Sequence, residues 1–191
     1  MRGFLDELAA RTPVPGGGGA AALTGALAAG LVAMAARFSA RQLPEAGDLA
    51  DQADELRRRV AGLAEADARA YTSVLEALRL PGEAGPRRAD QRREALLGAA
   101  VVPLEIAEIG ARVAQLAVRV AEAGNPNLRG DAVTGALLAA ASARSAACLV
   151  DINVRLGGLD PELTQRAARA VADASSAADR AADRPCADPA G

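Results

Sequence analysis

The sequence predicts an all-α protein, an up-and-down bundle of about five to six helices, and three observations support this. Half of the 191 residues are hydrophobic, which is enough to bury a sizeable core in one domain. Alanine and leucine dominate this half, whereas the chain has two Phe, one Tyr and no Trp, a composition typical of helices rather than sheets. Short Gly- and Pro-containing breaks separate the apolar blocks, which favours antiparallel neighbours.

The breaks divide the chain into six helical blocks, at about 3–11, 19–41, 48–79, 88–123, 131–156 and 161–183. The segments that end these blocks are TPVPGGGG, QLPEAG, LPGEAGP, AGNPNLRG and GGLDP, all rich in residues that favour turns. We expect a single domain over residues 1–183 and a flexible tail over 184–191.

The second block is apolar on all sides, with no charge from Val14 to Ala36. This length could span a bilayer, but alanine and glycine drive insertion weakly. We therefore expect no membrane span, and instead a central bundle helix or one that a second subunit partly covers. Two stripes run along this block at helical spacing. One consists of small residues, and the other is bulky and consists of Leu23, Leu27, Leu31, Met34 and Phe38.

The third and fourth blocks each carry one residue that breaks the apolar pattern. Asp67 lies on the apolar stripe between Leu63 and Tyr71, where a carboxylate is costly unless it is paired or faces a wet cavity. It is a general acid or base with a raised pKa, a core Asp bonded to a hydroxyl or an Arg, or a residue at the boundary of the apolar face of a rotated helix. Pro103 removes a backbone donor and predicts a kink in the fourth block.

Composition excludes several classes of function. The chain has no His, and all 22 basic residues are Arg, so His-based triads, imidazole bases, lysine Schiff bases and a Walker lysine are excluded. A net charge of −2 argues against non-specific nucleic-acid binding. The two cysteines form no disulfide framework, and the charged N-terminus does not look like a signal sequence, so we expect a cytoplasmic protein.

Three further clusters could bind a ligand. Four glycines before the second block, Gly16–Gly19, let backbone N–H groups approach an anion, or they form a sharp entry turn. The segment GNPNLRGD crowds polar groups before the fifth block, where Asp131 could act in chemistry or only compensate the helix dipole. Asn153 lies among apolar neighbours, and Tyr71 either stacks on a flat ring or belongs to the core.

Taken together, these segments resemble the cyclodeaminase/cyclohydrolase family, which includes the C-terminal domain of formiminotransferase-cyclodeaminase and stand-alone methenyltetrahydrofolate cyclohydrolases. The matching segments cover roughly residues 4–160 and are TPVPGGGGAAALTGALAAGLVAM, EADARAYTSVLEALRLP, VVPLEIAE, GNPNLRGDA and DINVRL. Each is weak alone, but five in order are specific. The resemblance implies a helical bundle, a homodimer, and a tetrahydrofolate site close to the subunit interface, with no metal.

The resemblance also implies one-carbon chemistry on folate. It makes Asp67 and Asp131 the leading acid/base candidates, and their mutual repulsion in one site would keep one of them protonated. The substrate contacts that we expect are Gly16, Gly17, Gly18, Gly19, Arg37, Arg41, Tyr71, Asn125, Asn127 and Asn153. Of these, Arg37 and Arg41 would meet the glutamate carboxylates of folate. Leu149 departs from the family pattern, because relatives often carry Asn there.

The resemblance implies two enzyme functions and leaves one non-catalytic alternative. We expect first a formimidoyltetrahydrofolate cyclodeaminase, which forms 5,10-methenyltetrahydrofolate and ammonia. The alternative is a methenyltetrahydrofolate cyclohydrolase, since both reactions pass through a tetrahedral carbon between N5 and N10. A further alternative is a non-catalytic folate-binding or helical interaction module.

Overall fold

A computed structural model describes residues 2–79 and 85–183, and over these residues every regular element is a helix and none is a strand. The elements are α1 (Arg2–Leu8), α2 (Gly17–Arg37), α3 (Ala46–Arg79), α4 (Pro86–Ala123), the 3-10 helix η1 (Pro126–Leu128), α5 (Arg129–Gly157) and α6 (Glu162–Ala182). The all-α prediction is therefore confirmed. The tail expected over 184–191 lies outside the described residues.

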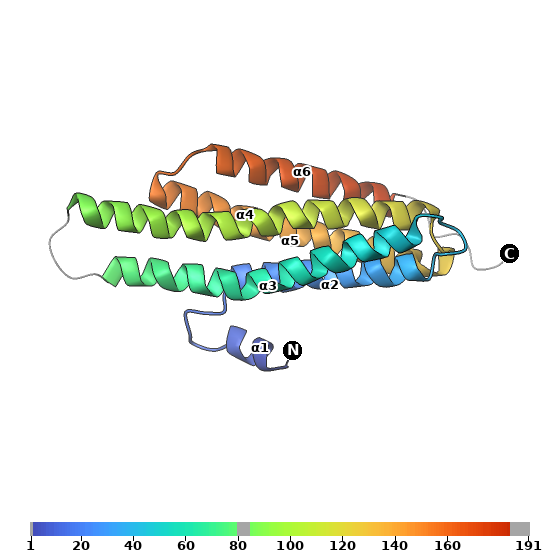
Figure 1. Ribbon diagram of the computed structural model, residues 1–191, viewed down its shortest axis with the longest axis horizontal. Helices are drawn as coiled ribbons and strands as arrows, with labels where there is room; N and C mark the ends of the chain where they lie inside the picture. The colour runs from blue at the N-terminus through green and yellow to red at the C-terminus, as the bar shows by residue number, and fades with distance from the viewer. Residues whose placement is uncertain (1, 80–84, 184–191) are drawn as a thin grey trace.

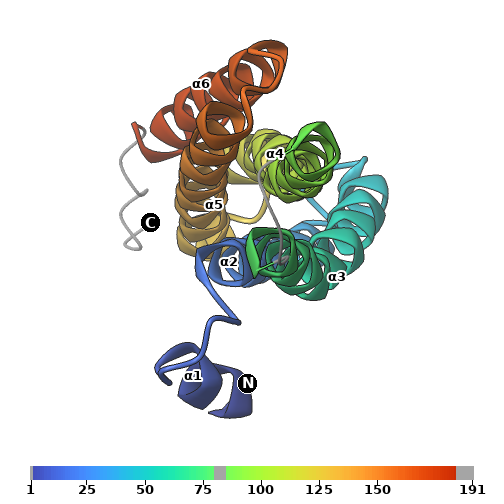
Figure 2. The ribbon, with the colours of Figure 1, turned by 90° about the vertical axis from the view of Figure 1, so that its left-hand side faces the viewer.

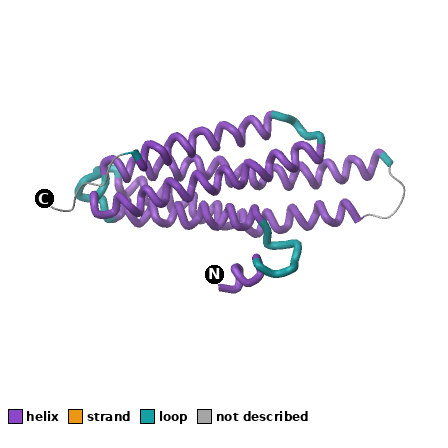
Figure 3. The backbone as a smooth tube through the Cα atoms, turned by 180° about the vertical axis from the view of Figure 1, so that it is seen from behind, coloured by secondary structure: helices purple, strands orange, loops and turns teal. Residues whose placement is uncertain are grey.

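Helices α2 to α5 run alternately up and down the long axis of the molecule (Figure 1). Viewed along that axis, α2, α3, α4 and α5 surround the core, and α6 covers α4 and α5 from outside (Figure 2). Helix α1 stands away from the bundle on the far side of α2. The described connections from α2 to α3, from α4 to α5 and from α5 to α6 lie toward the ends of the bundle (Figure 3), so residues far apart in sequence meet there.

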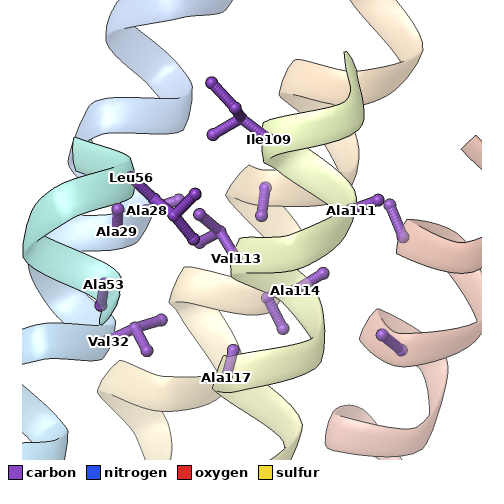
Figure 4. Close-up of a cluster of buried hydrophobic side chains, with 14 of the residues drawn as sticks. Ala28, Ala29, Val32, Ala53, Leu56, Ile109, Ala111, Val113, Ala114 and Ala117 are labelled. Carbon is purple, nitrogen blue, oxygen red and sulfur yellow. The ribbon is translucent and has the colours of Figure 1, made fainter. Parts of the chain in front are cut away.

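Small side chains build most of the core. Alanines of α2, α3 and α4 surround a few larger residues such as Val32, Leu56 and Val113 (Figure 4). The helices come so close that a Cβ on Gly110 of α4 would lie 2.9 Å from the carbonyl oxygen of Ala139 in α5. Backbone packing of this kind lets a chain with few aromatic residues fill its interior.

The alanine side of α2 faces the core, and part of its bulky stripe faces outward. Ala22 and Ala29 are fully buried, whereas Leu27 is 52% and Phe38 is 64% exposed. On α5 the neighbouring outer face adds Leu137, which is 50% exposed. The interpretation of α2 as a helix that its own bundle covers only in part is consistent with this arrangement.

Two helix features differ in detail from the expected ones. Helix α2 ends at Arg37 rather than near Arg41, because the Ser39 carbonyl accepts hydrogen bonds from the N–H groups of Gln42 and Leu43 and closes a turn. Helix α4 continues through Pro103 as one element, with the proline fully buried. The kink expected there remains a prediction.

Two segments are long and apolar enough to cross a bilayer by length and composition, Gly17–Arg37 and Pro126–Gly157. About half of each apolar window is buried inside the bundle, 56% and 44%. Core helices of bundles pass the same test, because they too carry few charges.

Candidate active site

A pocket of about 300 Å³ lies at the end of the bundle where α2 begins and α5 ends. The first turn of α2, the second half of α3 and the last turns of α5 line it, together with Ala99 of α4 and the segment before α2. Six of the lining residues were expected from the sequence to contact the substrate or to transfer protons: Gly16, Gly17, Gly18, Asp67, Tyr71 and Asn153. The tertiary structure thus brings together residues that are up to 137 positions apart.

A larger groove, about 860 Å³, lies between α3, α4 and α6. Four of its charged side chains form ion pairs, Arg59 with Glu105 and Arg166 with Glu108. None of the residues that the sequence analysis singled out for chemistry lines it. We therefore place the candidate active site in the smaller pocket, where the unusual carboxyl group lies.

Asp67 is half-buried and leans onto the first turn of α2. Its carboxylate accepts a hydrogen bond from the backbone N–H of Gly19, the third residue of that helix. The N-cap residue is Gly16, which has no side chain, so a carboxylate from α3 takes the capping role. Desolvation by burial raises the pKa of Asp67, and the Gly19 hydrogen bond opposes this only in part.

Gly18 is the position where Asp67 meets α2. A Cβ built on Gly18 would lie 2.0 Å from Oδ1 and 2.4 Å from Oδ2 of Asp67, so both oxygens lie across the bare backbone. The glycine run was expected to let a ligand approach the backbone closely. A close approach does occur at Gly18, but the group that approaches is the carboxylate of Asp67. Gly16 and Gly17 also line the pocket, while Gly19 is buried against Phe4 and Pro15.

Asn153 enters the pocket from α5 with its amide already held. Its Nδ2 donates a 2.7 Å hydrogen bond to the carbonyl oxygen of Ala99 on α4, and Oδ1 remains to accept. Tyr71, one turn beyond Asp67 on α3, is 45% exposed at the pocket edge, so it is not a core residue of this chain. Polar groups of three helices therefore surround one small space.

The remaining expected residues lie at the opposite end of the bundle. Asp131 is in the first turn of α5, and Asn153 follows it by 22 positions, which at about 1.5 Å per residue is roughly 33 Å. Asn125 caps η1 by accepting from the N–H of Asn127 at 3.0 Å, and its own Nδ2 donates to the carbonyl of Phe38. Within one chain, bundle packing does not bring Asp67 and Asp131 to one cleft, because α5 separates them by its whole length.

Arg37 and Arg41 also lie at that far end, where α2 stops. The Arg37 guanidinium is 2.5 Å from Asp54, and Arg57 is 3.1 Å from the same carboxylate. Hydrogen bonds from Arg37 and then Arg57 hold the pKa of Asp54 below its usual range. Arg37 is thus engaged by its own chain, about 30 Å along α2 from the glycine run.

Sequence reasoning missed the apolar and backbone parts of the pocket. Ala99, Leu149 and Ile152 line it, as do Pro13 and Val14 before α2. The spacing of Leu149, Ile152 and Asn153 on one helical face was the available signal for the α5 wall. Ala99 had no signal of its own, because its contribution is a carbonyl oxygen.

The described residues, 2–79 and 85–183, offer few clusters of metal-ligating side chains. Within those ranges no group of three or more His, Cys, Asp or Glu is placed to hold a metal ion. The expectation of a metal-free site stays a prediction.

Comparisons with known proteins match most of the chain, and the range of the family-model match includes the positions that line the pocket. The family model described as formiminotransferase-cyclodeaminase matches residues 1–173. A methenyltetrahydrofolate cyclohydrolase of Methylorubrum extorquens is 39% identical over 166 residues, which is 82% of this chain and 79% of that protein. The formimidoyltransferase-cyclodeaminase of Mus musculus is 35% identical over 141 residues, 65% of this chain but 25% of the mouse protein.

The fold has a solved counterpart as well. The crystal structure of formiminotetrahydrofolate cyclodeaminase from Thermotoga maritima superposes with a TM-score of 0.84 at 26% sequence identity. The match covers 95% of this chain and 92% of that one. The order of motifs, the helical bundle and the family match agree, and the chain therefore belongs to the formiminotransferase-cyclodeaminase family.

Proposed function

We propose that this protein is a folate one-carbon enzyme that acts at the carbon between N5 and N10 of a tetrahydrofolate derivative, as a methenyltetrahydrofolate cyclohydrolase. The observation that carries the proposal is the half-buried carboxyl group of Asp67, whose pKa is raised, in a pocket with an oriented amide. The relative from Methylorubrum extorquens, which matches over about four fifths of both chains, supports this choice of reaction.

The proposed reaction needs one group that takes up and returns a proton. The water oxygen attacks the methenyl carbon, and the Asp67 carboxylate accepts a proton from this water. When the tetrahedral intermediate opens, the bond from this carbon to N5 breaks, N5 receives a proton from the Asp67 carboxyl, and the second water proton leaves to solvent. A raised pKa favours a carboxyl group that can both accept and return a proton, and a chain without His or Lys has few other groups for this role.

A cyclodeaminase is the second candidate, and the sequence analysis placed it first. The solved relative from Thermotoga maritima carries that name. In this reaction N10 attacks the formimino carbon, and the nitrogen leaves as ammonia after it is protonated. The same carboxyl group would take the proton of N10 and deliver one to the leaving amine, so the pocket serves either reaction.

One assay separates the two reactions. Purified protein should remove the absorbance of 5,10-methenyltetrahydrofolate faster than buffer does if it is a cyclohydrolase. It should instead create this absorbance from 5-formiminotetrahydrofolate, with release of ammonia, if it is a cyclodeaminase. Binding of folate with neither turnover would support the non-catalytic module and reject both enzyme proposals.

A homodimer would reunite the two separated carboxylates. The outer face of α2 and α5 has no charge on α2 before Arg37 and a single one, Arg144, between Asp131 and Asp151 on α5. A two-fold axis perpendicular to this face reverses the helix direction, which would carry the partner's far end to the level of Asp67. The groove beside this face, about 770 Å³ between α1, α2 and neighbouring residues, is lined almost wholly by apolar side chains and supports burial there.

In this proposal the partner's copies of Asp131, Asn125, Asn127, Arg37 and Arg41 would lie near the pocket that Asp67 lines. Their expected roles as acid/base and substrate-binding groups then require two chains. In this proposal the tetrahydrofolate derivative is the substrate, and the reaction uses no metal. The protein binds neither nucleic acid nor a membrane and is located in the cytoplasm.

A further inference from the structure

Pro103 and Asn153 are linked through one carbonyl group. In an α-helix the carbonyl of residue 99 accepts its hydrogen bond from the N–H of residue 103. Residue 103 is a proline inside α4, and proline has no N–H. The carbonyl of Ala99 is thereby left without its helical donor at the wall of the pocket.

Asn153 supplies the donor that the helix lacks. Its Nδ2 lies 2.7 Å from the Ala99 oxygen, across the interface between α5 and α4. An asparagine amide has one donating and one accepting end, and it can rotate to present either. Because the buried carbonyl of Ala99 accepts only from the donating end, the amide is held in one of its two orientations.

We propose that Pro103 is a positioning residue that acts through Asn153: by freeing the Ala99 carbonyl, it sets the Asn153 amide so that Oδ1 faces the pocket as a hydrogen-bond acceptor. The group of the ligand that meets Asn153 is therefore an N–H or O–H donor. A reduced pterin ring carries several N–H donors of this kind. The identity of the ligand rests on the proposed function, whereas the orientation of the Asn153 amide rests on geometry alone.

The proposal also accounts for a costly residue in a helix interior. Proline inside a helix is less favourable than alanine because it removes a hydrogen bond and crowds the preceding turn. Pro103 is fully buried, away from any helix end. If a residue helps the site at the expense of its helix, its replacement should lower the affinity for ligand without lowering the stability of the protein.

The test replaces Pro103 with alanine, which restores an N–H to compete for the Ala99 carbonyl. In the P103A protein we expect the dissociation constant for 5-formyltetrahydrofolate, a stable reduced folate, to rise about tenfold, the effect of losing one well-oriented hydrogen bond. The melting temperature should stay the same or rise. A merely structural proline would change in the opposite way, with lower stability and unchanged affinity per folded molecule.

The matched control is Pro86→Ala in the same helix. Pro86 is at the start of α4, where an N–H has no helical partner, so its replacement releases no carbonyl at the pocket. This variant should bind 5-formyltetrahydrofolate as the unaltered protein does.

A second readout needs no folate. The chain has three asparagines, Asn125, Asn127 and Asn153, so the Asn153 side-chain amide signal can be assigned by its loss in N153D. Its protons should exchange with water at least about tenfold more slowly than those of exposed Asn127, and P103A should remove this protection. Equal exchange rates, or unchanged protection and affinity in P103A, would overturn the proposal.

These readouts separate the two claims. If the unaltered protein does not bind folate, the proposed function fails, while the exchange rates still decide whether Pro103 holds Asn153.

Discussion

Replacing Gly18 with alanine should displace the carboxylate on which the proposed chemistry depends. The added Cβ would lie 2.0 Å from Oδ1 of Asp67, whereas real Cβ atoms do not approach a neighbour closer than 3.0 Å. The carboxylate therefore has to move by about 1 Å or more, and a misplacement of about 1 Å can cost on the order of 100-fold in rate. The same movement breaks the hydrogen bond from the N–H of Gly19.

The stability of this variant should change much less than its activity. Losing a capping hydrogen bond costs about 1 kcal/mol, and replacing glycine by alanine in a helix returns up to about 1 kcal/mol. We expect kcat to fall by roughly 100-fold, with an unchanged circular dichroism spectrum and a melting temperature within a few degrees. The assay is the change in methenyltetrahydrofolate absorbance under saturating substrate.

Gly62→Ala is the matched control. Gly62 is on α3, the helix that carries Asp67, and a Cβ there meets nothing within 4 Å. This variant should keep full activity. If Gly18→Ala also keeps full activity while folded, then the contact between Asp67 and the start of α2 is not part of the catalytic arrangement, and the reasoning fails.

Three further predictions address the proton chemistry and the assembly. Because burial raises the pKa of Asp67, the folded state holds this proton more tightly than the unfolded chain, so the group's contribution to the free energy of unfolding falls as the pH rises through that pKa. Denaturant titrations from pH 4 to 8 should show that Asp67→Asn loses this dependence, keeps its fold and loses turnover; an active Asp67→Asn protein would exclude the role as acid and base. Asp131→Ala should reduce turnover by roughly 100-fold with the fold intact by circular dichroism, and an unchanged rate would leave Asp131 with the helix dipole alone. Leu27→Asp places a charge in the uncharged face of α2 and should yield an inactive monomer by sedimentation, whereas a fully active monomer would reject the shared site.

Much of the fold followed from local patterns. The expected blocks end within a few residues of the observed helices, as at Arg79 and Ala123, because glycine and proline terminate helices by their own backbone chemistry. Asp67 could be singled out for the same kind of reason. A carboxylate at an apolar position of a helical repeat can be recognised from the sequence alone.

The sequence by itself determined which segments are helices and which polar residues interrupt their apolar faces. Only the tertiary structure decided that Asp67 meets Gly18 and Gly19 of α2, that Asp131 lies a helix length away, and that Asn153 reaches the carbonyl of Ala99. Helical periodicity specifies which side of a helix is buried, because it depends on the spacing of neighbours along the chain. It does not specify which helix ends meet, since that depends on how close the alanine and glycine faces of separate helices can pack.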